Sequence, residues 1–484
     1  MTIELPEPRD YIAGQWATPA VELADWVEDP NTGELVQHQR ATADDQIEAA
    51  LAAADGAAGP WAATDPEARA DLLDALAADL QGRVEESARL ESATSGAVIG
   101  VTSMLGFITH GAFSLAAQML RSGMTAETLT ADSGNAVEVH RLGWGPALLL
   151  CPWNAPAPMA AHKVASALAA GCPVIIKPPE RAPHGSAVLA EAADAVGLPA
   201  GVVQLVHGGP PVAQALMTDD RVRAVSFTGG IGGGRAVGHA CAEGLKPAQL
   251  ELGGHSPMVV MPDADLDAAA GGVAALLTTL NGQWCRALGR LLVPAEAHDQ
   301  LLDKVSAILG HLVVGDSLDP GSQMGPIVHS AHLDLLRARV AELEGLGGTA
   351  HAWSALPEGD GNWLAPTLVT GVDPTHTETE IFGPVATVHP YDSVDEALQL
   401  ANATPYGLEA YVYGTDEDAA MAFARQVRAG GVKVNGASPI SLHLMAPRPA
   451  WGISGLHDEG TRETIQFFMG SRVVGVEAPM SFDS

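Results

Sequence analysis

The middle of the chain alternates short apolar runs with longer segments of helical periodicity. Four runs are typical of buried strands: PALLLCP, CPVIIKP, VVQLVHG and VRAVSFTG, which begin at residues 146, 172, 202 and 222. The segments between them, MAAHKVASALAAG, GSAVLAEAADAVG and PPVAQALMTD, predict helices. Because strands that alternate with helices form parallel βαβ units, this region predicts a doubly wound sheet.

The same alternation returns later in the chain. RLLVP, ATVHPYD, LEAYVYG and GVKVNG predict strands, SVDEALQLANA predicts a helix, and together they indicate a second α/β domain. TLTADSGNAVEVHRL alternates as a hairpin does, and SRVVGVEAPM near the end is a candidate for its matching strand. A helix nearer the N-terminus is predicted to begin with Asp65 as N-cap and Pro66 in its first turn. Its apolar positions are Leu72, Leu73, Leu76 and Leu80.

Length, charge and cysteine content limit the partners and the location that we expect for the protein. The 484 residues indicate about three domains, and they include 58 acidic and 25 basic side chains, for a net charge of −33. Such a charge repels nucleic acid and anionic membranes, so neither is an expected partner. The N-terminal residues lack the features of a signal peptide, and four prolines exclude a spanning helix from the uncharged stretch Leu142–Ala161. Four cysteines do not make a disulfide framework in a chain of this length, which predicts a reducing, cytoplasmic location.

Polar residues follow three of the predicted strands of the first sheet. LLLCPWN ends at Asn154, VIIKPPE carries Lys177 and Glu180, and VSFTGGIGGG ends in a glycine-rich turn. Alone, each could be a proline-rich bend or a surface charge, and the turn fails the G-x-G-x-x-G pattern because, with Gly230 as the first position, the sixth is Arg235. Since ligands bind outside the carboxyl ends of parallel strands, their occurrence together predicts a binding site there.

Two further segments add chemistry to this site. QLELGGHSP carries Glu251, and NGQWCRALGR carries Cys285. An unpaired cysteine alone is more often a small core residue. With Glu251 and Asn154, however, Cys285 makes a coherent set of a thiol nucleophile, a carboxylate base for water and an amide that can stabilise an oxyanion.

These segments resemble the NAD(P)-dependent aldehyde dehydrogenase superfamily over nearly the whole chain. The motifs that carry the resemblance are YIAGQW, DPNTGELV, PWN, KPPE, FTGG, ELGG, GQWC, MGPIV, APTLV, EIFGPV and YGLEAYVYG. The resemblance implies an α/β fold with two doubly wound domains and a small β arm for oligomerisation. The implied NAD-binding domain comprises 1–121 and 144–249, the catalytic domain 250–447, and the arm 122–143 and 470–484.

The resemblance also implies roles for individual residues. Cys285 is the expected nucleophile, Glu251 the general base, and Asn154 with the backbone N–H of Cys285 the oxyanion hole. The implied cofactor-binding residues are Pro152, Trp153, Lys177, Glu180, Phe227, Thr228, Gly229, Gly230, Gly234, Leu252, Glu380 and Phe382. The implied substrate pocket consists of Ala155, Pro158, Met159, His162, Trp284 and Arg286. No metal is expected.

The implied activity is NAD-dependent oxidation of a small-molecule aldehyde to its acid by a homodimer or homotetramer. We expect NAD rather than NADP, since the Glu180 carboxylate would repel a 2′-phosphate, although Lys177 offsets some of that repulsion. One alternative is transfer of the acyl group to coenzyme A, against which Glu251 argues because such relatives generally lack this glutamate. The other is a non-catalytic member of the fold, against which the intact catalytic set argues.

Some positions leave questions open. Gly230 stands where the family usually has serine, and His255 and Gly452 stand where lysine is common. Trp284 is either a pocket wall or packing against the preceding helix. Arg286 either reaches the substrate channel, where it would favour semialdehydes and lower the pKa of Cys285, or turns away to pair with a carboxylate.

Overall fold

The structure, a computed structural model, describes residues 4–132 and 134–477. Its first sheet has eight strands in the order β2-β1-β9-β8-β7-β10-β11-β21, and the five strands from β9 to β11 are parallel. Each of the four apolar runs that begin the sequence pattern contains one of these strands, which confirms those predictions. The bounds are β1 (Asp10–Ile12), β2 (Gln15–Ala17), β7 (Ala147–Leu150), β8 (Val174–Lys177), β9 (Val203–Leu205), β10 (Ala224–Thr228), β11 (Ala248–Glu251) and β21 (Gly455–Leu456).

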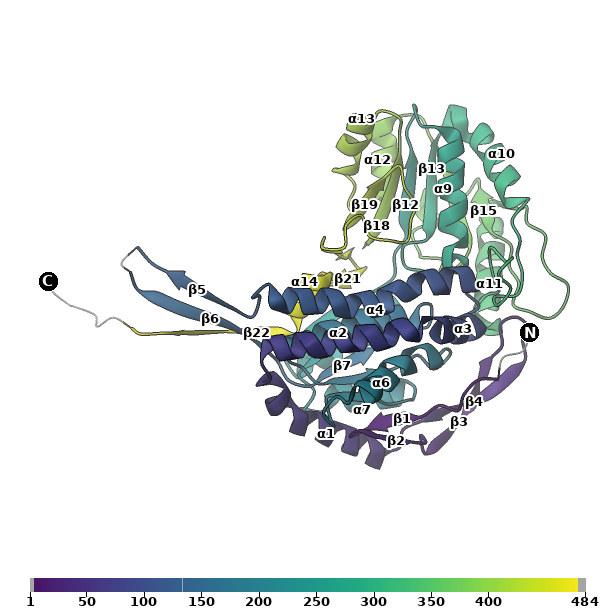
Figure 1. Cartoon of the computed structure of the whole chain (residues 1–484). Coiled ribbons are helices and arrows are strands. Elements are labelled where there is room, and N and C mark those ends of the chain that lie inside the picture. The colour runs from purple at the N-terminus through teal and green to yellow at the C-terminus, as the bar shows by residue number, and fades with distance from the viewer. Residues whose placement is uncertain (1–3, 133, 478–484) are drawn as a thin grey trace.

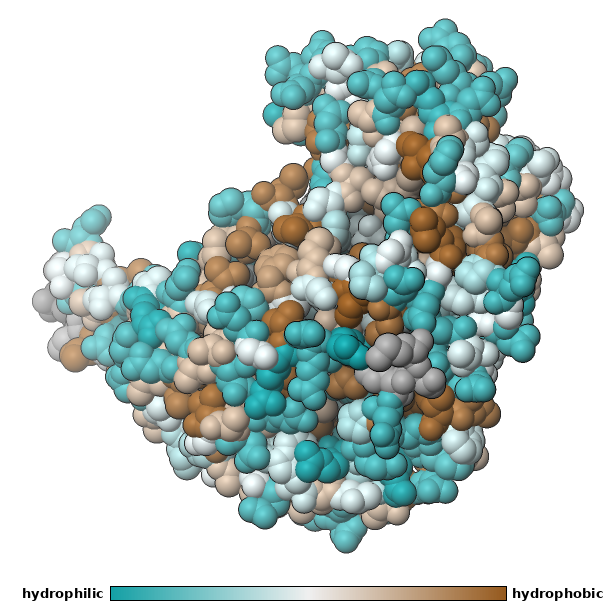
Figure 2. Space-filling view, turned by 45° about the vertical axis from the view of Figure 1, so that its right-hand side comes forward, coloured by the Kyte–Doolittle hydropathy of each residue, from teal (hydrophilic) through white to brown (hydrophobic). Residues whose placement is uncertain are grey.

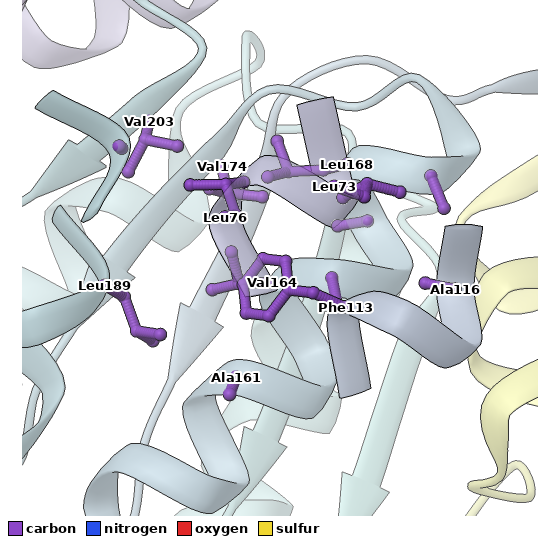
Figure 3. Packing of buried hydrophobic residues seen from close by; sticks show 14 of the residues in the cluster. Leu73, Leu76, Phe113, Ala116, Ala161, Val164, Leu168, Val174, Leu189 and Val203 are labelled. Atoms are coloured by element: carbon purple, nitrogen blue, oxygen red, sulfur yellow. The ribbon is translucent and has the colours of Figure 1, made fainter. Parts of the chain in front are cut away.

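Helices cover both faces of this sheet. One face packs on α2, α4, α5 and α6, and the other packs on α1, α7 and α8. Figure 3 shows how side chains of α2, α4, α5 and α6 meet those of β8 and β9 in one apolar core. Asp65 caps α2 by accepting bonds from two backbone N–H groups, as predicted. The bounds are α1 (Asp44–Ala62), α2 (Pro66–Gly82), α3 (Val84–Ser95), α4 (Ile99–Arg121), α5 (Pro156–Ala170), α6 (His184–Val196), α7 (Pro210–Thr218), α8 (Ile231–Glu243) and α14 (Thr461–Phe467).

The second sheet forms the upper domain of Figure 1. Its seven strands have the order β14-β15-β16-β13-β12-β18-β19 and are parallel apart from β14. Helices α9 and α10 pack on one face, and α12 and α13 on the other. The strands are β12 (Ser256–Val260), β13 (Leu288–Pro294), β14 (Thr349–Ala352), β15 (Thr367–Thr370), β16 (Val385–Tyr391), β18 (Glu409–Tyr413) and β19 (Gly431–Val434). The helices are α9 (Leu266–Thr278), α10 (His298–Leu309), α11 (Ser330–Gly345), α12 (Val394–Asn402) and α13 (Glu417–Ala424).

A three-stranded sheet projects from the body of the molecule (Figure 1). It pairs β22 (Met469–Gly475) with β6 (Ala136–Gly143), and β6 with β5 (Ala126–Thr130), all antiparallel. The predicted hairpin and its matching strand are therefore joined; the end of the predicted arm, 478–484, lies outside the described residues. Two further strand pairs are β3 (Val21–Glu28) with β4 (Leu35–Ala41) and β17 (Tyr406–Gly407) with β20 (Trp451–Gly452).

Helix α4 contains an uncharged stretch that the sequence analysis did not consider. Its residues before Arg121 form a longer uncharged stretch than Leu142–Ala161, and by length and composition alone α4 is the one helix of the described chain that could cross a membrane. In the protein it packs on the first domain, with Phe113 and Leu120 buried in the core shared with α2 and α5. Leu142–Ala161 contains β7 and the first turns of α5 instead.

Candidate active site

Cys285 follows a turn of unusual backbone conformation. Leu280, Asn281 and Gly282 have successive positive φ angles of 49°, 57° and 69°. For a residue other than glycine this left-handed conformation costs about 1–2 kcal/mol. Asn281 is fully buried and stabilises the turn, because its Nδ2 donates to the carbonyls of Gly96 (2.8 Å) and Pro326 (2.9 Å). Its Oδ1 also accepts a bond from the N–H of Gly325 (2.8 Å), so the buried side chain of Asn281 holds the turn by hydrogen bonds.

Glu251 is brought to Cys285 by the end of β11. Sγ of Cys285 lies 3.9 Å from Oε1 of Glu251 and donates to it. The two glycines after Glu251 make this approach possible: a Cβ on Gly254 would overlap the carbonyl oxygen of Cys285, and one on Gly253 would overlap the carboxylate of Glu380. The predicted domain boundary between 249 and 250 falls inside β11, so Glu251 is positioned by the first sheet.

Asn154 reaches the same place from the loop after β7. Its Nδ2 donates to the carbonyl of Gln283 at 2.9 Å, two residues before Cys285. Gln283 is itself fixed, since its Oε1 accepts a bond from the N–H of Val328 at 3.1 Å. An amide nitrogen carries two hydrogens, so one N–H of Asn154 fixes its orientation and the other is available to an oxyanion.

The electrostatics of the site follow from burial and from neighbouring charges. Burial, together with the charge of Glu251, raises the pKa of the Cys285 thiol well above its usual range. Burial and the charge of Glu459 raise the pKa of Glu251 to about 7. Glu459 itself stays ionised: burial would raise its pKa, but Lys163 at 2.8 Å and Arg448 at 3.4 Å lower it.

Arg286 is paired, which answers the question left open by the sequence. Its Nε lies 3.1 Å from Oε2 of Glu409, and its Nη2 lies 3.6 Å from Oε1 of Glu251. The side chain borders the cavity in front of Cys285, but its guanidinium lies within ion-pair distance of two carboxylates. The structure thus favours pairing with carboxylates over a free positive charge in the substrate channel.

The predicted adenosine-binding residues lie together at the end of β8. Nζ of Lys177 donates to the carbonyls of Pro178 (3.0 Å) and Gly208 (2.6 Å) and to Oε1 of Glu180 (2.7 Å). All three hydrogens of the ammonium group are therefore used within the protein. The carboxylate of Glu180 stays one-third exposed, so it is the member of the pair that is accessible to a ligand.

The glycine-rich turn leads from β10 into α8. Gly230 is the N-cap of α8, its backbone is extended, and a Cβ placed there would meet nothing within 4 Å. A Cβ on Gly229 would instead overlap the ring of Phe227, and one on Gly234 would overlap Leu252. The N-cap residue Gly230 has no side chain to cap the first N–H groups of α8, which suits them to an anionic ligand such as a pyrophosphate.

The EIFGPV segment faces this edge of the sheet from the second domain. Oε1 of Glu380 accepts a bond from the N–H of Gly254 at 2.9 Å, and burial raises the pKa of Glu380 to about 7. The ring of Phe382 meets that of Trp153 edge to face at 5.4 Å. Trp153 and Pro152 directly precede Asn154, and Thr228 pairs with Glu251 across β10 and β11. Glu380 and Phe382 of the second domain thus contact residues that follow β11 and β7 of the first sheet.

A cavity of about 390 Å³ opens in front of Cys285, Glu251 and Asn154. All six predicted pocket residues line it, so the structure brings them together. Trp284 also packs against the preceding helix, where its Nε1 donates to the carbonyl of Leu276 at 3.4 Å. His162 contacts Oγ1 of Thr464 at 3.0 Å, and burial lowers its pKa to about 3, so its imidazole is neutral. Hydrophobic residues gather in the hollow below the upper domain in Figure 2.

Much of the cavity wall was missed by the sequence analysis. One side comes from α4 and the other from the segment 439–446. The apolar side chains that these elements contribute are Leu105, Phe107, Ile108, Ala112, Leu115, Pro439, Ile440, Leu444 and Ala446. The uncharged stretch of α4 is a sequence signal that could have predicted one side of the wall. A helix that is apolar on more than one face is expected to contact something other than its own domain core.

The chain is similar in sequence and in structure to known proteins. A model of the aldehyde dehydrogenase family matches residues 21–474. The chain belongs to the aldehyde dehydrogenase family. It is 34% identical to geranial dehydrogenase of Castellaniella defragrans, over 94% of this chain and 96% of the relative. It is also 34% identical to succinate-semialdehyde dehydrogenase of Paenarthrobacter nicotinovorans, over 91% and 98%. Among solved structures it resembles a cysteine-to-alanine variant of aldehyde dehydrogenase C of Pseudomonas syringae, in complex with NAD⁺ and octanal. That match has a TM-score of 0.92 and 30% identity over 98% of each chain.

Two departures from the usual family pattern have a structural reason in this dehydrogenase. Gly452 has a φ of 61°, and a Cβ there would overlap the carbonyl of Pro405. A lysine at 452 would therefore strain the backbone as it runs here. His255 is buried, its Nε2 lies 2.6 Å from the carbonyl of Thr377, and burial lowers its pKa to about 3. A neutral imidazole therefore packs where a lysine would bring a charge.

The other thiols of the dehydrogenase are less accessible than Cys285. Cys151, Cys172 and Cys241 are buried and free, whereas Cys285 is intermediate in exposure. Burial raises the pKa of Cys151 to about 12 and that of Cys172 to about 11. Within the described ranges, no group of three or more histidine, cysteine or acidic side chains could hold a metal ion.

Proposed function

We propose that this protein catalyses the NAD-dependent oxidation of an uncharged, apolar aldehyde to its carboxylic acid, with Cys285 as nucleophile and Glu251 as general base. The observation that carries the proposal is that one carboxylate oxygen, Oε1 of Glu251, lies 3.9 Å from Sγ of Cys285 at the end of an apolar cavity. A base at hydrogen-bond reach of a thiol is the arrangement that activates a nucleophile.

The first half of the reaction forms a covalent bond between the sulfur and the aldehyde carbon. The thiol proton passes to Glu251, whose carboxylate is the nearest base, while the carbonyl oxygen becomes an oxyanion. The second N–H of Asn154 and the backbone N–H of Cys285 stabilise that charge. Loss of one such donor typically lowers the rate by about 10²–10³. The bound cofactor supplies the hydride acceptor, after which the acyl group is held as a thioester on Cys285.

The second half of the reaction releases the acid. Glu251 first releases to solvent the proton that it took from the thiol. It then takes a proton from water while the water oxygen bonds to the thioester carbon, the bond from that carbon to sulfur breaks, and Glu251 returns the proton to the sulfur of Cys285. Oε2 of Glu251 has no hydrogen-bond partner among the described residues, so it can accept a proton without breaking a protein contact. A glutamate here supports hydrolysis rather than transfer of the acyl group to coenzyme A.

The residues at the edge of the first sheet fit a dinucleotide. Gly230 and Gly232 leave open space at the start of α8 for a pyrophosphate. Glu180 would accept bonds from the adenosine-ribose hydroxyls, and Glu380 with Phe382 would hold the nicotinamide end. Since a carboxylate at Glu180 repels a 2′-phosphate, we propose NAD⁺ as the preferred cofactor.

The cavity supports an uncharged substrate. Its walls are mainly apolar, and both arginines among the described residues that line it are paired: Arg286 with Glu409 and Glu251, and Arg448 with Glu459. A carboxylate on the substrate would therefore find no free cation there. Burying such a charge without a partner is costly.

The test is a matched pair of substrates. Octanal and 8-oxooctanoate have the same chain length and differ in one terminal carboxylate. We expect kcat/KM for octanal to exceed that for 8-oxooctanoate at least about tenfold, with the acid as product and no acceleration by coenzyme A. Cys285→Ala should form no NADH. Preference for 8-oxooctanoate, acyl-coenzyme A as product, or NADH formation by Cys285→Ala would each overturn the corresponding part of the proposal.

We also propose that the projecting arm pairs copies of this chain. Each of its outer strands, β5 and β22, has one edge that pairs with no strand of the described residues and that another chain can extend. Exposed apolar side chains line the arm: Leu129, Val473, Val474 and Val476. These features support a homodimer or a dimer of dimers.

A further inference from the structure

Three charged side chains form a buried line behind Cys285. Arg286 precedes β13, Glu409 begins β18, and Lys433 lies on β19. Nε of Arg286 lies 3.1 Å from Oε2 of Glu409, and Nζ of Lys433 lies 4.0 Å from Oε1 of the same carboxylate. Removing paired charges from water gains little stability, because desolvation offsets their attraction. A line of three buried charges next to the nucleophile therefore needs a reason other than stability.

One end of the line contacts the catalytic base. Nη2 of Arg286 lies 3.6 Å from Oε1 of Glu251, the oxygen that also accepts from Cys285. The backbone of Arg286 is fixed as well, because Oη of Tyr411 donates to its carbonyl at 2.8 Å. The guanidinium thus holds one oxygen of Glu251 and leaves Oε2 without a partner in the described protein.

The other end of the line is anchored to the cavity wall. Nζ of Lys433 donates to the carbonyls of Ser438 (2.6 Å) and Ile440 (3.0 Å), and Ile440 borders the cavity. The carboxylate of Glu409 also lies close to the backbone of Gly431, where a Cβ would come within 2.8 Å of its Oε1. Glu409, placed by these contacts, lies 3.1 Å from Nε of Arg286.

We propose that Arg286, anchored by Glu409 and Lys433, is a positioning residue that holds the Glu251 carboxylate beside Cys285 for hydrolysis of the acyl-enzyme. The inference rests on the proposed function. Its chemistry is electrostatic: the guanidinium favours the ionised form of Glu251, and Glu409 offsets part of that positive charge.

The surrounding charges set the direction of each effect. Burial and Glu459 raise the pKa of Glu251 to about 7, and Arg286 comes first among the cations that lower it, ahead of Arg448 and Lys163. Removing the charge of Arg286 therefore raises this pKa, and removing the charge of Glu409 lowers it. The titratable and charged groups that face Arg286 are Glu251, Glu409, Cys285, Tyr411 and Lys433.

The experiment isolates hydrolysis from cofactor and aldehyde. Cys285 is acetylated with p-nitrophenyl acetate, excess reagent is removed, and the loss of the acetyl group is followed by mass spectrometry between pH 5 and 9. The midpoint of the rate–pH curve reports ionisation of the base. We expect Arg286→Met to move this midpoint up by about one pH unit or more, Glu409→Gln to move it down, and Arg286→Lys to stay near the wild type. A second buried arginine of the domain, Arg290, bonds to the carbonyls of Leu400, Ala401 and Ala403. Arg290→Met is the matched control and should not move the midpoint.

The outcomes distinguish a failure of this inference from a failure of the proposed function. If Cys285 is not acetylated, or if Glu251→Gln hydrolyses the acetyl-enzyme as fast as the wild type, the proposed function fails. If Glu251→Gln hydrolyses the acetyl-enzyme slowly, but Arg286→Met and Glu409→Gln leave the midpoint of the rate–pH curve unchanged, then this inference fails and the proposed function stands. It also fails if Arg286→Met changes only the pH dependence of Cys285 alkylation by iodoacetamide, since the guanidinium then acts on the thiol. If Arg286→Met does not fold, Glu409→Gln alone tests the inference: a downward shift of the midpoint supports it, and an unchanged midpoint overturns it.

Discussion

Replacing Asn281 by alanine tests whether the turn before Cys285 is held by one side chain. The substitution removes the amide and leaves three buried backbone groups without their partner: the carbonyls of Gly96 and Pro326 and the N–H of Gly325. An unpaired buried polar group costs about 1–3 kcal/mol, so the loss is about 3 kcal/mol or more. Alanine also tolerates the left-handed backbone at 281 less well than asparagine does.

That loss is large against the few kcal/mol that hold a loop in one conformation. A nucleophile displaced by about 1 Å loses on the order of 10² in rate. We therefore expect Asn281→Ala to lower kcat/KM for octanal about hundredfold or more, to lower Tm, and to leave the Kd for NAD⁺ nearly unchanged. Asn402 is the matched control, since it bridges the carbonyl of Gln426 and the N–H of Arg428 away from the cavity. Wild-type kcat/KM in Asn281→Ala, or an equal loss in Asn402→Ala, would refute the reasoning.

Three further predictions concern the base, the cofactor and the arm. The pKa of Glu251 is near 7, so with this carboxylate as the proposed base the hydrolysis rate of the acyl-enzyme should rise about tenfold from pH 6 to its plateau, and a flat profile would argue against this base. The ratio of kcat/KM for NAD⁺ over NADP⁺ should fall at least about tenfold in Glu180→Gln, because the charge that repels a 2′-phosphate is gone; an unchanged ratio would remove Glu180 from cofactor selection. Val473→Asp on β22 places a charge on an exposed apolar strand and should shift the assembly toward monomer in light scattering, whereas a wild-type mass would exclude this strand from the interface.

The sequence predicted the sheet strands and part of the candidate site because these have local signals. Strands β7 and β8 are buried along their whole length, so they consist of apolar residues up to Lys177 at the end of β8. The chemistry at their ends, Asn154 and Lys177, follows from the topology of a parallel sheet. Glu251 and Cys285 needed the family resemblance, since nothing local places a carboxylate beside a thiol.

Contacts between distant segments could not be predicted in the same way. Glu409, the partner of Arg286, lies in a different βα unit, and nothing in LEAYVYG marks its glutamate as buried. The cavity wall from α4 and 439–446 exists only after the two domains pack. The sequence partly indicates the role of Asn281, because an Asn-Gly pair favours a left-handed backbone. Its hydrogen-bond partners, the carbonyls of Gly96 and Pro326, are brought to it only by the tertiary structure.

The central claim, that oxidation passes through a thioester on Cys285 which Glu251 hydrolyses, is tested most directly by trapping that intermediate. Glu251→Gln is mixed with NAD⁺ and octanal, and peptides are analysed by mass spectrometry while NADH is followed by absorbance. We expect about one NADH per subunit, together with a persistent gain at Cys285 equal to the mass of the aldehyde less two hydrogens. Continued turnover at the wild-type rate with no adduct, or an adduct on Cys151, Cys172 or Cys241 instead, would contradict the claim.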